Sequence, residues 1–367
     1  MRILFLTRYG QMGASSRMRC FQYIPWLENM GMKCTVTPLF NDSQLAQRYR
    51  TERYELPGLL LSYFRRVLVL WQNRHCDLIW IEKEALPWFP VWFERWLLSG
   101  VPFVLDYDDA IFHNYDLHPS PILRYIFGKR IDRMMVAARL VVAGNKYIAR
   151  RARCAGAPNV EILATVIDLD RYPRISGSSL AHTKLLNIVW IGSPSTAPYL
   201  ELLNKPLLEL SRHFIFNLRV IGCETFTMPG VEVERLPWSE TTEQSLISSC
   251  DIGVMPLVDS PWERGKCGYK LIQYMACELP VVASPVGVNS EIVRTGENGF
   301  FATSEKTWVD ALGKLLSDAA LREQMGAAGR KRVEEAYCIQ KAAPHLAQLL
   351  RDAVEGRLRV STRDDLT

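Results

Sequence analysis

With 367 residues, the chain is long for a single hydrophobic core and has room for two domains of ordinary size. Its hydrophobic content of 48% and charged content of 23% are typical of a soluble globular protein. No apolar run approaches the ~18 residues that span a bilayer, and the first run, Ile3–Leu6, is too short for the core of a signal peptide. We therefore expect a cytoplasmic protein.

The formal net charge of +5 is unevenly distributed along the chain. Residues 1–180 carry 24 basic and 16 acidic side chains, whereas residues 181–367 carry 20 and 23. A basic N-terminal half suggests an anionic partner on that side, either a membrane surface or an acidic acceptor.

The nine cysteines are scattered singly along the chain. The nearest pair, Cys267 and Cys277, has no histidine or further cysteine beside it, which argues against a zinc site. We expect reduced and mostly buried thiols.

The N-terminal half reads as alternating strands and helices, which predicts a parallel sheet with helices on both faces. The first strand, Ile3–Thr7, ends in a turn rich in glycine and serine, and a helix is expected from about Arg17 to Met30. Gly13 lets the backbone of this turn approach a ligand, and Ser15 and Ser16 can cap the helix.

Two apolar stretches with basic residues follow. The first, LPGLLLSYFRRVLVLWQNRH within residues 41–75, is explained most simply by a buried helix, and the alternative is an amphipathic helix that contacts a membrane. Leu86–Gly100 carries three tryptophans and leaves the same two interpretations open, because amphipathic aromatic rings suit a membrane interface and a core alike.

Acidic clusters follow the next two predicted strands. Asp77–Ile81 ends at Glu82-Lys83-Glu84, and Pro102–Leu105 ends at a run that contains Asp108, Asp109 and His113. The carboxyl ends of parallel strands form the ligand crevice of such a sheet, so both clusters should face it. The aspartate pair near His113 could hold a metal ion, bind sugar hydroxyls or cap a helix.

The rest of the chain continues the alternation. A basic helix is expected over Ile122–Ala138, and a hinge near Tyr172–His182, where proline, glycine and serine interrupt the pattern. The further predicted strands are Leu140–Ala143, Val160–Leu163, Leu186–Ile191, Phe216–Ile221, Val231–Leu236 and Asp251–Leu257, and a last helix covers about Ile339–Val354.

The stretch Trp262–Phe301 carries the most chemistry. A loop with Arg264, Gly265, Lys266 and Gly268 leads into an apolar-periodic helix, and the buried strand LPVVAS follows. The start of a helix leaves backbone N–H groups unpaired and carries the positive end of the helix dipole. With Lys266 and Lys270 nearby, this loop predicts a phosphate or pyrophosphate site. The alternative is a tight turn with solvated lysines.

The run KLIQYMACELPVVASPVG, followed by NGF, resembles the donor-binding segment of retaining, nucleotide-sugar-dependent glycosyltransferases of the GT-B type, family 4 (glycosyl transferases group 1). SSRMRCFQYIPWLENMG and LDYDDAIFH resemble the corresponding turn and acidic segment of these enzymes. The family usually has two glutamates eight residues apart, where this chain has Gly265 and Gln273. The first departure removes a carboxylate expected near the transferred sugar. The second is milder, because an amide still hydrogen-bonds the ribose hydroxyls.

The resemblance implies an α/β fold of two Rossmann-like domains that face each other across a cleft. We expect an N-terminal acceptor-side domain over 1–174, a nucleotide-sugar-binding domain over 183–338, a helix over 339–356 that crosses back to the first domain, and a polar tail over 357–367. The turn after Leu186–Ile191 lacks the arginine and lysine that relatives place there, so Ser193 supplies a hydroxyl and other cations must neutralise the pyrophosphate.

The resemblance also implies the activity, transfer of a sugar from a nucleoside-diphosphate sugar to an acceptor hydroxyl with retention, in cell-surface polysaccharide or glycolipid synthesis. No metal and no cofactor are expected. The acceptor would be a glycan or a lipid-linked molecule. The anionic inner face of the membrane is a candidate partner surface. No nucleic-acid partner is expected. The expected catalytic residues are Asp108, Asp109 and His113, and the expected donor-binding residues are Gly13, Ser193, Trp238, Arg264, Lys266, Lys270 and Gln273.

Two other functions stay open. The first is a catalytically inactive homologue that binds a nucleotide sugar or glycan as a scaffold. Gly265, in place of the usual glutamate, favours this function. Lys266, Lys270 and Gln273 argue against it, because they are hard to explain without a ligand. A nicotinamide-dependent oxidoreductase is the more distant alternative, because the chain has no complete glycine fingerprint with its downstream acid.

Overall fold

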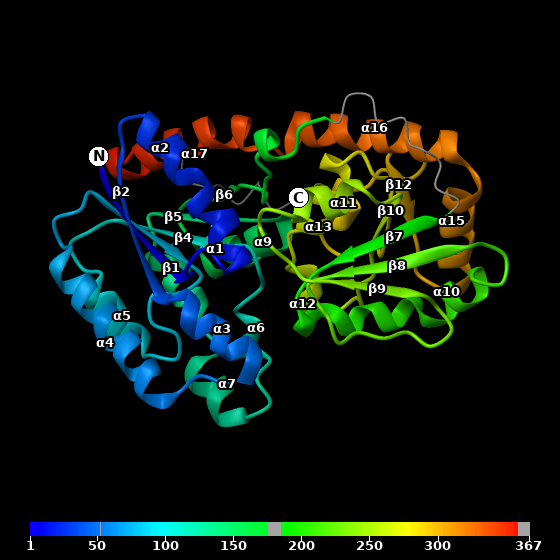
Figure 1. Cartoon of the computed structure of the whole chain (residues 1–367). Coiled ribbons are helices and arrows are strands. Elements are labelled where there is room, and N and C mark those ends of the chain that lie inside the picture. Colours follow the sequence, from blue (N-terminus) through cyan, green and yellow to red (C-terminus); the bar gives the residue numbers. More distant parts are fainter. Residues whose placement is uncertain (52, 175–184, 359–367) are drawn as a thin grey trace. The chain divides into compact units, whose positions relative to one another are not determined.

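The computed structural model describes residues 1–51, 53–174 and 185–358, and within them the chain forms two compact units (Figure 1). Unit 1 comprises Met1–Thr165, Gly265–Cys267 and the chain from Lys341 onward, and unit 2 comprises Val166–Arg264 and Gly268–Gln340. Most of the expected hinge, residues 175–182, lies outside the described residues, as does the expected tail from residue 359.

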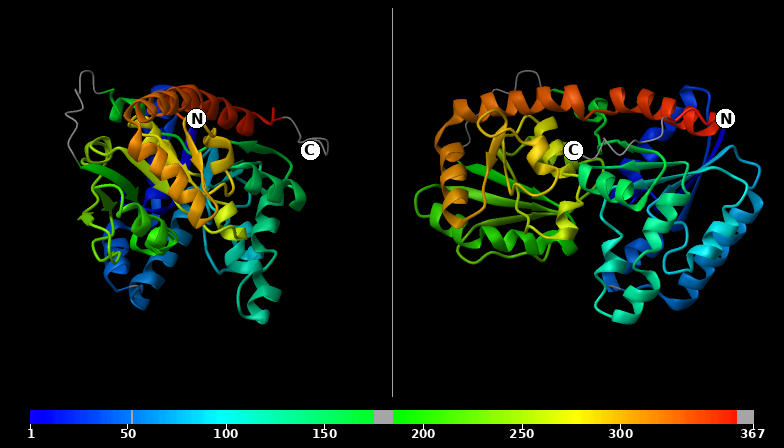
Figure 2. Two further views of the ribbon diagram at one scale, coloured as in Figure 1. Left: turned by 90° about the vertical axis from the view of Figure 1, so that its right-hand side faces the viewer. Right: turned by 180° about the vertical axis from the view of Figure 1, so that it is seen from behind.

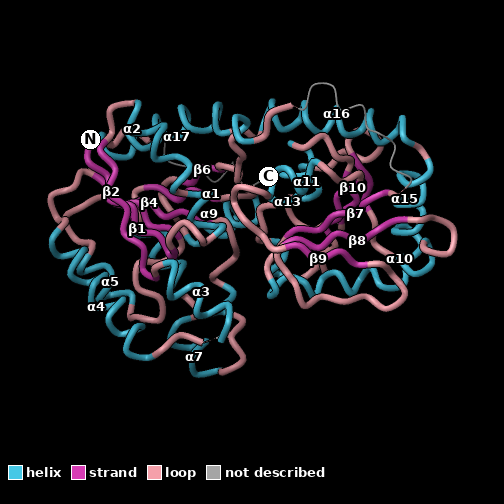
Figure 3. The backbone as a smooth tube through the Cα atoms, in the orientation of Figure 1, coloured by secondary structure: helices cyan, strands magenta, loops and turns pink. Residues whose placement is uncertain are grey.

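Unit 1 is built on a six-stranded parallel sheet with the strand order β2-β1-β3-β4-β5-β6. Every side chain of β3, β4 and β5 is buried, as the continuous apolar runs predict for a parallel sheet covered on both faces. Figure 3 shows these strands together, with helices around them. The strands are β1 (Arg2–Tyr9), β2 (Lys33–Phe40), β3 (Leu78–Glu82), β4 (Phe103–Tyr107), β5 (Leu140–Ala143) and β6 (Val160–Ile162).

The predicted first helix is interrupted. It consists of α1 (Ala14–Arg19), a 3-10 turn (Phe21–Tyr23) and α2 (Ile24–Asn29). Cys20 leaves helical geometry with φ −128° and ψ −67°, and a proline occupies the first turn of α2, where its missing N–H costs no hydrogen bond. The predicted capping by Ser15 and Ser16 is wrong, because both residues lie inside α1.

The first apolar stretch forms two helices, α3 (Asp42–Thr51) and α4 (Leu56–Gln72), and α5 (Val91–Leu97) follows β3. The simplest interpretation, a buried helix, is wrong for α4. Its buried positions include Ser62 and Arg66, whereas several of its large apolar side chains face solvent. Arg66 donates a hydrogen bond to the carbonyl oxygen of Thr7 at 2.7 Å, which explains how this charged side chain is accommodated.

The predicted basic helix Ile122–Ala138 is also divided, into α7 (Pro121–Phe127) and α8 (Arg130–Ala137). A Cβ atom on Gly128 would lie 2.4 Å from the carbonyl oxygen of Arg124, so glycine permits the close turn between the two helices. Unit 1 is completed by α6 (His113–Asp116), α9 (Lys146–Ala155) and, from Lys341 onward, α17 (Ile339–Glu355), whose Arg351 donates to the carbonyl oxygen of Met30 at 3.1 Å. A 3₁₀ segment (Leu169–Arg171) lies near the start of unit 2.

Unit 2 contains a second six-stranded parallel sheet, with the order β12-β11-β10-β7-β8-β9. The bounds predicted for its first two strands are confirmed. The strands are β7 (Leu186–Ile191), β8 (Phe216–Ile221), β9 (Val233–Leu236), β10 (Ile252–Met255), β11 (Val281–Ala283) and β12 (Gly299–Phe301).

The helices of unit 2 pack their apolar faces on this sheet. Trp190 on β7, Leu218 on β8 and Trp308 on α15 are among the buried residues of one continuous core. Figure 2 shows α15 and α16 in orange on the unit that carries the second sheet. The helices are a 3-10 helix (Pro194–Leu203), α10 (Asn204–Leu210), α11 (Glu243–Ser248), α12 (Pro261–Arg264), α13 (Tyr269–Ala276), α14 (Asn289–Ile292), α15 (Glu305–Ser317) and α16 (Ala319–Ala336).

Candidate functional site

In unit 1, the carboxyl ends of β3 and β4 bring a lysine between two carboxylates. The Nζ atom of Lys83 lies 3.1 Å from Oδ1 of Asp108 and 3.0 Å from Oδ2 of Asp109. Ser15 on α1 donates a hydrogen bond to the other oxygen of Asp108. The third possibility considered for the aspartates, helix capping, is wrong, because the residue that precedes α6 is Phe112.

The charges of this cluster stabilise each other. Burial alone would raise the pKa of the Asp108 carboxyl, but the Lys83 ammonium and the Ser15 hydroxyl outweigh burial and hold that pKa below its usual value. Burial would lower the pKa of Lys83, and the two aspartates raise it well above its usual value instead. At neutral pH the cluster therefore contains charged Lys83 beside a charged Asp108.

The backbone of Lys83 adopts a left-handed conformation with φ 63°, which an L-residue with a long side chain rarely adopts. Its N–H donates to the carbonyl oxygen of Asp106 at 2.8 Å, and the N–H of Glu84 donates to the carbonyl oxygen of Glu82 at 2.8 Å. These hydrogen bonds hold the strained residue at the point where the strand ends. Strain of this kind is common at functional sites.

A layer of buried polar pairs lies beneath the cluster. Ser16 donates to Glu82 at 2.6 Å, and the N–H of Arg8 donates to the same carboxylate oxygen at 2.9 Å. Arg19 and Asp106 form a fully buried ion pair at 2.6 Å. Because these groups occupy the inner positions of α1 and β4, Asp108 and Asp109 are left as the outer carboxylates of the segment.

The third expected catalytic residue, His113, is held by its own neighbours. Its Nδ1 atom lies 2.8 Å from Asp116 and its Nε2 atom lies 2.9 Å from the hydroxyl of Tyr147. Asp116 also pairs with Arg151 at 3.0 Å. Both ring nitrogens are therefore engaged, and His113 could act on a substrate only if the hydroxyl of Tyr147 moved away.

The segment Gly265–Cys267 belongs to unit 1 and explains the missing glutamate. A Cβ atom on Gly265 would lie 2.3 Å from the Cβ atom of Ala110 and 2.7 Å from its backbone nitrogen. Asn145 fixes the segment by donating to the carbonyl oxygens of Gly265 at 2.8 Å and Lys266 at 3.1 Å. Position 265 therefore has no room for a carboxylate side chain.

Cys267 and Gly13 complete the expected residues of unit 1. The Cys267 thiol donates to the carbonyl oxygen of Asp108 at 2.8 Å, and burial raises its pKa well above the usual value, so it is not a reactive thiolate. Gly13 has an ordinary φ of −74°, and a Cβ atom there would lie 2.5 Å from the Cβ atom of Tyr9. Close packing against Tyr9 accounts for this glycine without a ligand.

In unit 2, α13 begins as the sequence predicts. Gly268 precedes it in a left-handed conformation with φ 64°, and a Cβ atom there would lie 2.4 Å from the Cδ1 atom of Ile292. Lys270 lies in the first turn of α13, with its ammonium 5.5 Å from the centre of the Trp190 ring. Arg264, by contrast, forms two hydrogen bonds to Asp259, at 2.6 and 3.0 Å.

Gln273 is a buried residue of α13 and part of a polar network. Its amide donates to the hydroxyl of Tyr172 at 3.2 Å, and that hydroxyl donates to Glu243 at 2.9 Å. The indole N–H of Trp238 donates to the second oxygen of Glu243 at 2.8 Å. The two expected donor residues Gln273 and Trp238 are thus joined through Tyr172 and Glu243.

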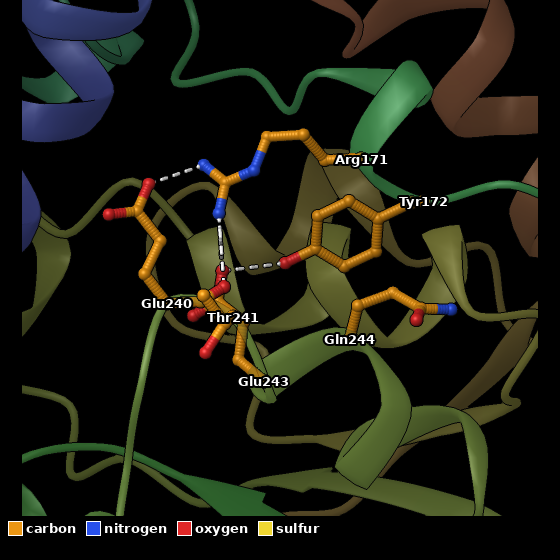
Figure 4. Close-up of a pocket in the computed structure, with 6 residues that line it drawn as sticks. All are labelled: Arg171, Tyr172, Glu240, Thr241, Glu243 and Gln244. Atoms are coloured by element: carbon orange, nitrogen blue, oxygen red, sulfur yellow. Dashed lines mark hydrogen bonds and ion pairs between the residues drawn. The ribbon is translucent and has the colours of Figure 1, made fainter.

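The network borders a cavity of about 420 Å³ within unit 2, which Figure 4 shows in close-up. Arg171 crosses it to pair with Glu240 at 2.8 Å. Its lining consists of Arg171, Tyr172, Glu240, Thr241, Glu243 and Gln244. Ser193, in the loop after β7, has its hydroxyl 2.8 Å from that of Ser195.

The sequence interpretation missed several of these residues. Lys83 carried a signal, because it directly follows a predicted strand whose end was expected at the ligand crevice. Arg171, Tyr172 and Glu243 carried none, since no local motif connects residues that lie 71 positions apart. In the described part of the chain, no group of three or more histidine, cysteine, aspartate or glutamate side chains is arranged to hold a metal ion.

Comparison with known proteins gives a consistent result. Residues 202–318 match the family model described as glycosyl transferases group 1. The chain is 29% identical over 149 residues to a D-inositol 3-phosphate glycosyltransferase of Paenarthrobacter aurescens, which covers 40% of this chain and 33% of that protein. It is 35% identical over 82 residues, 22% of each chain, to the capsular polysaccharide biosynthesis glycosyltransferase CapM of Staphylococcus aureus. The chain thus spans a third or less of the length of these relatives.

Among solved structures, that of Anabaena Alr3699/HepE in complex with UDP superimposes with a TM-score of 0.70. The match covers 96% of this chain and 100% of that one at 16% sequence identity. At this identity the similarity concerns the fold. Two parallel sheets of six strands each are the architecture that the resemblance implied.

Proposed function

Since residues 202–318 match the family model of glycosyl transferases group 1 and the chain has the two-domain α/β fold of the GT-B glycosyltransferases, we propose that it transfers a sugar from a nucleoside-diphosphate sugar to an acceptor hydroxyl. We propose further that transfer proceeds with retention and serves the synthesis of a cell-surface polysaccharide or glycolipid. The observation that carries the proposal is the buried network of Gln273, Tyr172, Glu243 and Trp238 beside a cavity in unit 2.

The nucleoside of the donor is assigned to this cavity. The cavity volume of about 420 Å³ lies within the ~300–1,000 Å³ of small-molecule sites and suits a base with its ribose. Tyr172 and Glu243 line the cavity, and Gln273 and Trp238 are hydrogen-bonded to them, so the network includes an amide that can bind a ribose hydroxyl and a ring that can stack on the base. The HepE structure supports the proposal because it is a complex with UDP of a protein of this fold.

The diphosphate is assigned to the start of α13. Lys270 stands in the first turn of this eight-residue helix, whose unpaired N–H groups and dipole favour an anion. When the bond between the sugar and the diphosphate breaks, negative charge develops on the leaving oxygen. A fixed ammonium and backbone N–H groups can stabilise it without a metal ion.

Asp108 and Asp109 in unit 1 are assigned to sugar or acceptor hydroxyls. Asp109 is the more accessible of the two, with 29% of its side chain exposed against 13% for Asp108. Lys83 keeps both carboxylates in fixed positions. Their role is to orient hydroxyl groups, which lowers the barrier by positioning the reactants.

A second candidate function is a scaffold that binds the nucleotide sugar without turning it over. The packing of Gly265 against Ala110 favours it, because the chain cannot place a carboxylate at position 265.

A thermal-shift panel of UDP, GDP, dTDP and their sugars, followed by a donor-hydrolysis assay, separates these functions. Stabilisation by one diphosphate together with its release from the sugar supports the transferase. Stabilisation without release, with every acceptor offered, supports the scaffold. If no nucleotide stabilises the protein, both proposals are wrong.

A further inference from the structure

Helix α4 in unit 1 presents apolar side chains to solvent along one face. Leu56, Leu60, Phe64, Leu68 and Trp71 are exposed, and their spacing of three or four residues places them in one stripe. Leu60 and Phe64 each have about three fifths of their surface exposed, at 62% and 61%. The helix contains no acidic residue, and Arg65 lies exposed within it.

Aromatic rings extend this stripe onto α5, which lies beside α4 in Figure 1. The rings of Trp71 and Trp96 are 6.4 Å apart, and Phe93 stacks on Trp96 at 6.0 Å. Trp92, at the outer side of α5, is 72% exposed. The guanidinium of Arg74 lies 4.6 Å from the Trp71 ring, so a cation accompanies the aromatic surface.

A basic cavity of about 470 Å³ adjoins α5 on the side of α8 and α9. The cations that line it are Arg95, Lys129, Arg133 and Arg151. Asp132 is the one acid of its lining. The guanidinium of Arg151 donates two hydrogen bonds to the carboxylate of Asp132, at 2.7 and 3.1 Å. Arg95 and Arg133 form no ion pair within the described residues, so the cavity carries an excess of positive charge.

We propose that this face docks on an anionic bilayer, with the α4–α5 surface at the boundary of the acyl chains and a lipid phosphate in the basic cavity. Exposed tryptophans suit the interface between headgroups and acyl chains, and guanidinium groups bind phosphate oxygens through paired hydrogen bonds. None of the helices in the described part of the chain has both the length and the hydropathy to cross a bilayer. Docking extends the proposed function, because it places a lipid-bound acceptor on the unit that carries Asp108 and Asp109.

The structure narrows the choice of basic residues for a docking test. Arg130 was grouped with the basic helix, but it is buried, where it pairs with Glu84 at 3.2 Å and with Glu94. Arg124 donates to the carbonyl oxygens of His118 at 2.7 Å and Pro119 at 3.2 Å. Changing Arg130 would perturb the fold and Arg124 is already bound to two carbonyl oxygens, so the docking test uses Arg95, Lys129 and Arg133.

Co-sedimentation of the full-length protein with vesicles measures docking directly. The parent should bind vesicles of phosphatidylglycerol and phosphatidylcholine at low salt, release at high salt, and ignore pure phosphatidylcholine. Changing Arg95, Lys129 and Arg133 together to serine should lower the partition coefficient about 100-fold. The matched control changes three exposed cations of unit 2, Arg212, Lys306 and Lys331, to serine and should bind nearly as the parent does.

The apolar part is tested by Phe64→Ser with Trp92→Ser, which should lower binding about tenfold or more. Ile215→Ser, at a site in unit 2 that is 78% exposed, is the control and should have no effect. Quenching of tryptophan fluorescence by brominated lipid should be weaker for Trp92→Phe than for the parent, which tests insertion even where a serine variant folds poorly.

Three outcomes would overturn the proposal. The parent could ignore anionic vesicles at low salt, the cavity variant could bind as tightly as the parent, or Phe64→Ser with Trp92→Ser could convert a dimer into a monomer without affecting vesicle binding. The last result would assign the face to a second copy of the chain. Vesicle binding needs no turnover, so an inactive protein that docks would refute the proposed transferase and leave the docking site standing.

Discussion

The two units hold their candidate residues by different physical means. In unit 1, Asp108 and Asp109 are fixed by the charge of Lys83, above the buried pair of Arg19 and Asp106. In unit 2, Gln273 is fixed by a chain of hydrogen bonds through Tyr172 to Glu243. Loss of one partner from a buried ion pair leaves an uncompensated charge, whereas loss of one hydrogen bond leaves a single polar group unpaired. Substitutions at the candidate residues of unit 1 should therefore lower mainly the stability of the fold, and those in unit 2 should lower mainly the affinity for the ligand.

The largest effect is expected from Arg19→Met. Both side chains of the Arg19–Asp106 pair are fully buried, so the variant leaves a buried carboxylate alone, and stability should fall by about 3–5 kcal/mol. Urea unfolding measures it. The double variant Arg19→Met with Asp106→Leu should recover most of the loss, and Lys205→Met, at an exposed pair with Glu305, should change nothing measurable. An Arg19→Met protein as stable as the parent would remove the contrast between the units.

The next effect concerns ligand affinity in unit 2. Lys270→Ala should weaken nucleoside-diphosphate binding by about 1.5–3 kcal/mol, the range of a hydrogen bond to a charged group, and leave nucleoside binding nearly unchanged. Titration calorimetry with both ligands measures it. Arg264→Ala is the matched variant and should lose less, because Arg264 is already paired with Asp259. Equal losses of diphosphate and nucleoside affinity would place the phosphates away from α13.

Gly265→Glu tests the missing carboxylate. If position 265 had room for a glutamate side chain and simply lacked one, the variant would gain activity. The approach to Ala110 predicts instead a loss of stability of about 1–3 kcal/mol, as for other overpacked sites. Thermal unfolding and donor hydrolysis are measured together. Ala110→Gly combined with Gly265→Glu should restore part of the stability, because it removes one of the two clashing groups.

Gln273→Leu should weaken binding of the nucleoside by about 1–2 kcal/mol, since it removes the amide and leaves the Tyr172 hydroxyl without that donor. Gln273→Glu is also expected to weaken it, because a second carboxylate would lie near Glu243. The unfolding free energy measured beside the affinity separates the two effects. A change in stability with unaltered affinity would make Gln273 a core residue only.

The smallest effect is a pH dependence. The pKa of Asp108 is depressed in the folded protein, so its stabilising contribution is present above its usual value of 3.8 and is lost as pH falls through the lower, folded value. Asp108→Asn should therefore flatten the acid side of the stability curve. The pKa of Lys83 is raised, so its contribution persists up to its usual value of 10.5 and is lost only at higher pH. Urea unfolding across acid pH compares the parent with Asp108→Asn.

The sequence predicted most of the framework because buried parallel strands have continuous apolar runs. The bounds of Leu140–Ala143, Leu186–Ile191 and Phe216–Ile221 agree with the structure. The breaks at Cys20 and Gly128 were missed, although a proline in the first turn of α2 and the glycine itself are local signals of a helix end. The exposure of α4 was left open between a buried and an amphipathic helix, because an apolar run does not record whether anything covers it.

The candidate site was predicted in part. The glycine before α13 and the position of Lys270 followed from local chemistry. The partners of Arg19 and Gln273, 87 and 101 residues away, did not, because no pattern in one sequence connects them. His113 was selected for its proximity in sequence to the aspartates, and the structure shows its ring nitrogens bound to Asp116 and Tyr147.

The left-handed backbone of Lys83 has a consequence for protein engineering. Glycine or asparagine fits such a position with less strain, so Lys83→Gly or Lys83→Asn would relieve the backbone at this residue. Either replacement would remove the ammonium between Asp108 and Asp109, and two neighbouring carboxylates would then disfavour each other's ionisation. The two ion pairs of Lys83 therefore oppose the relief of backbone strain, and a library selected for thermal stability should retain the lysine at this strained position.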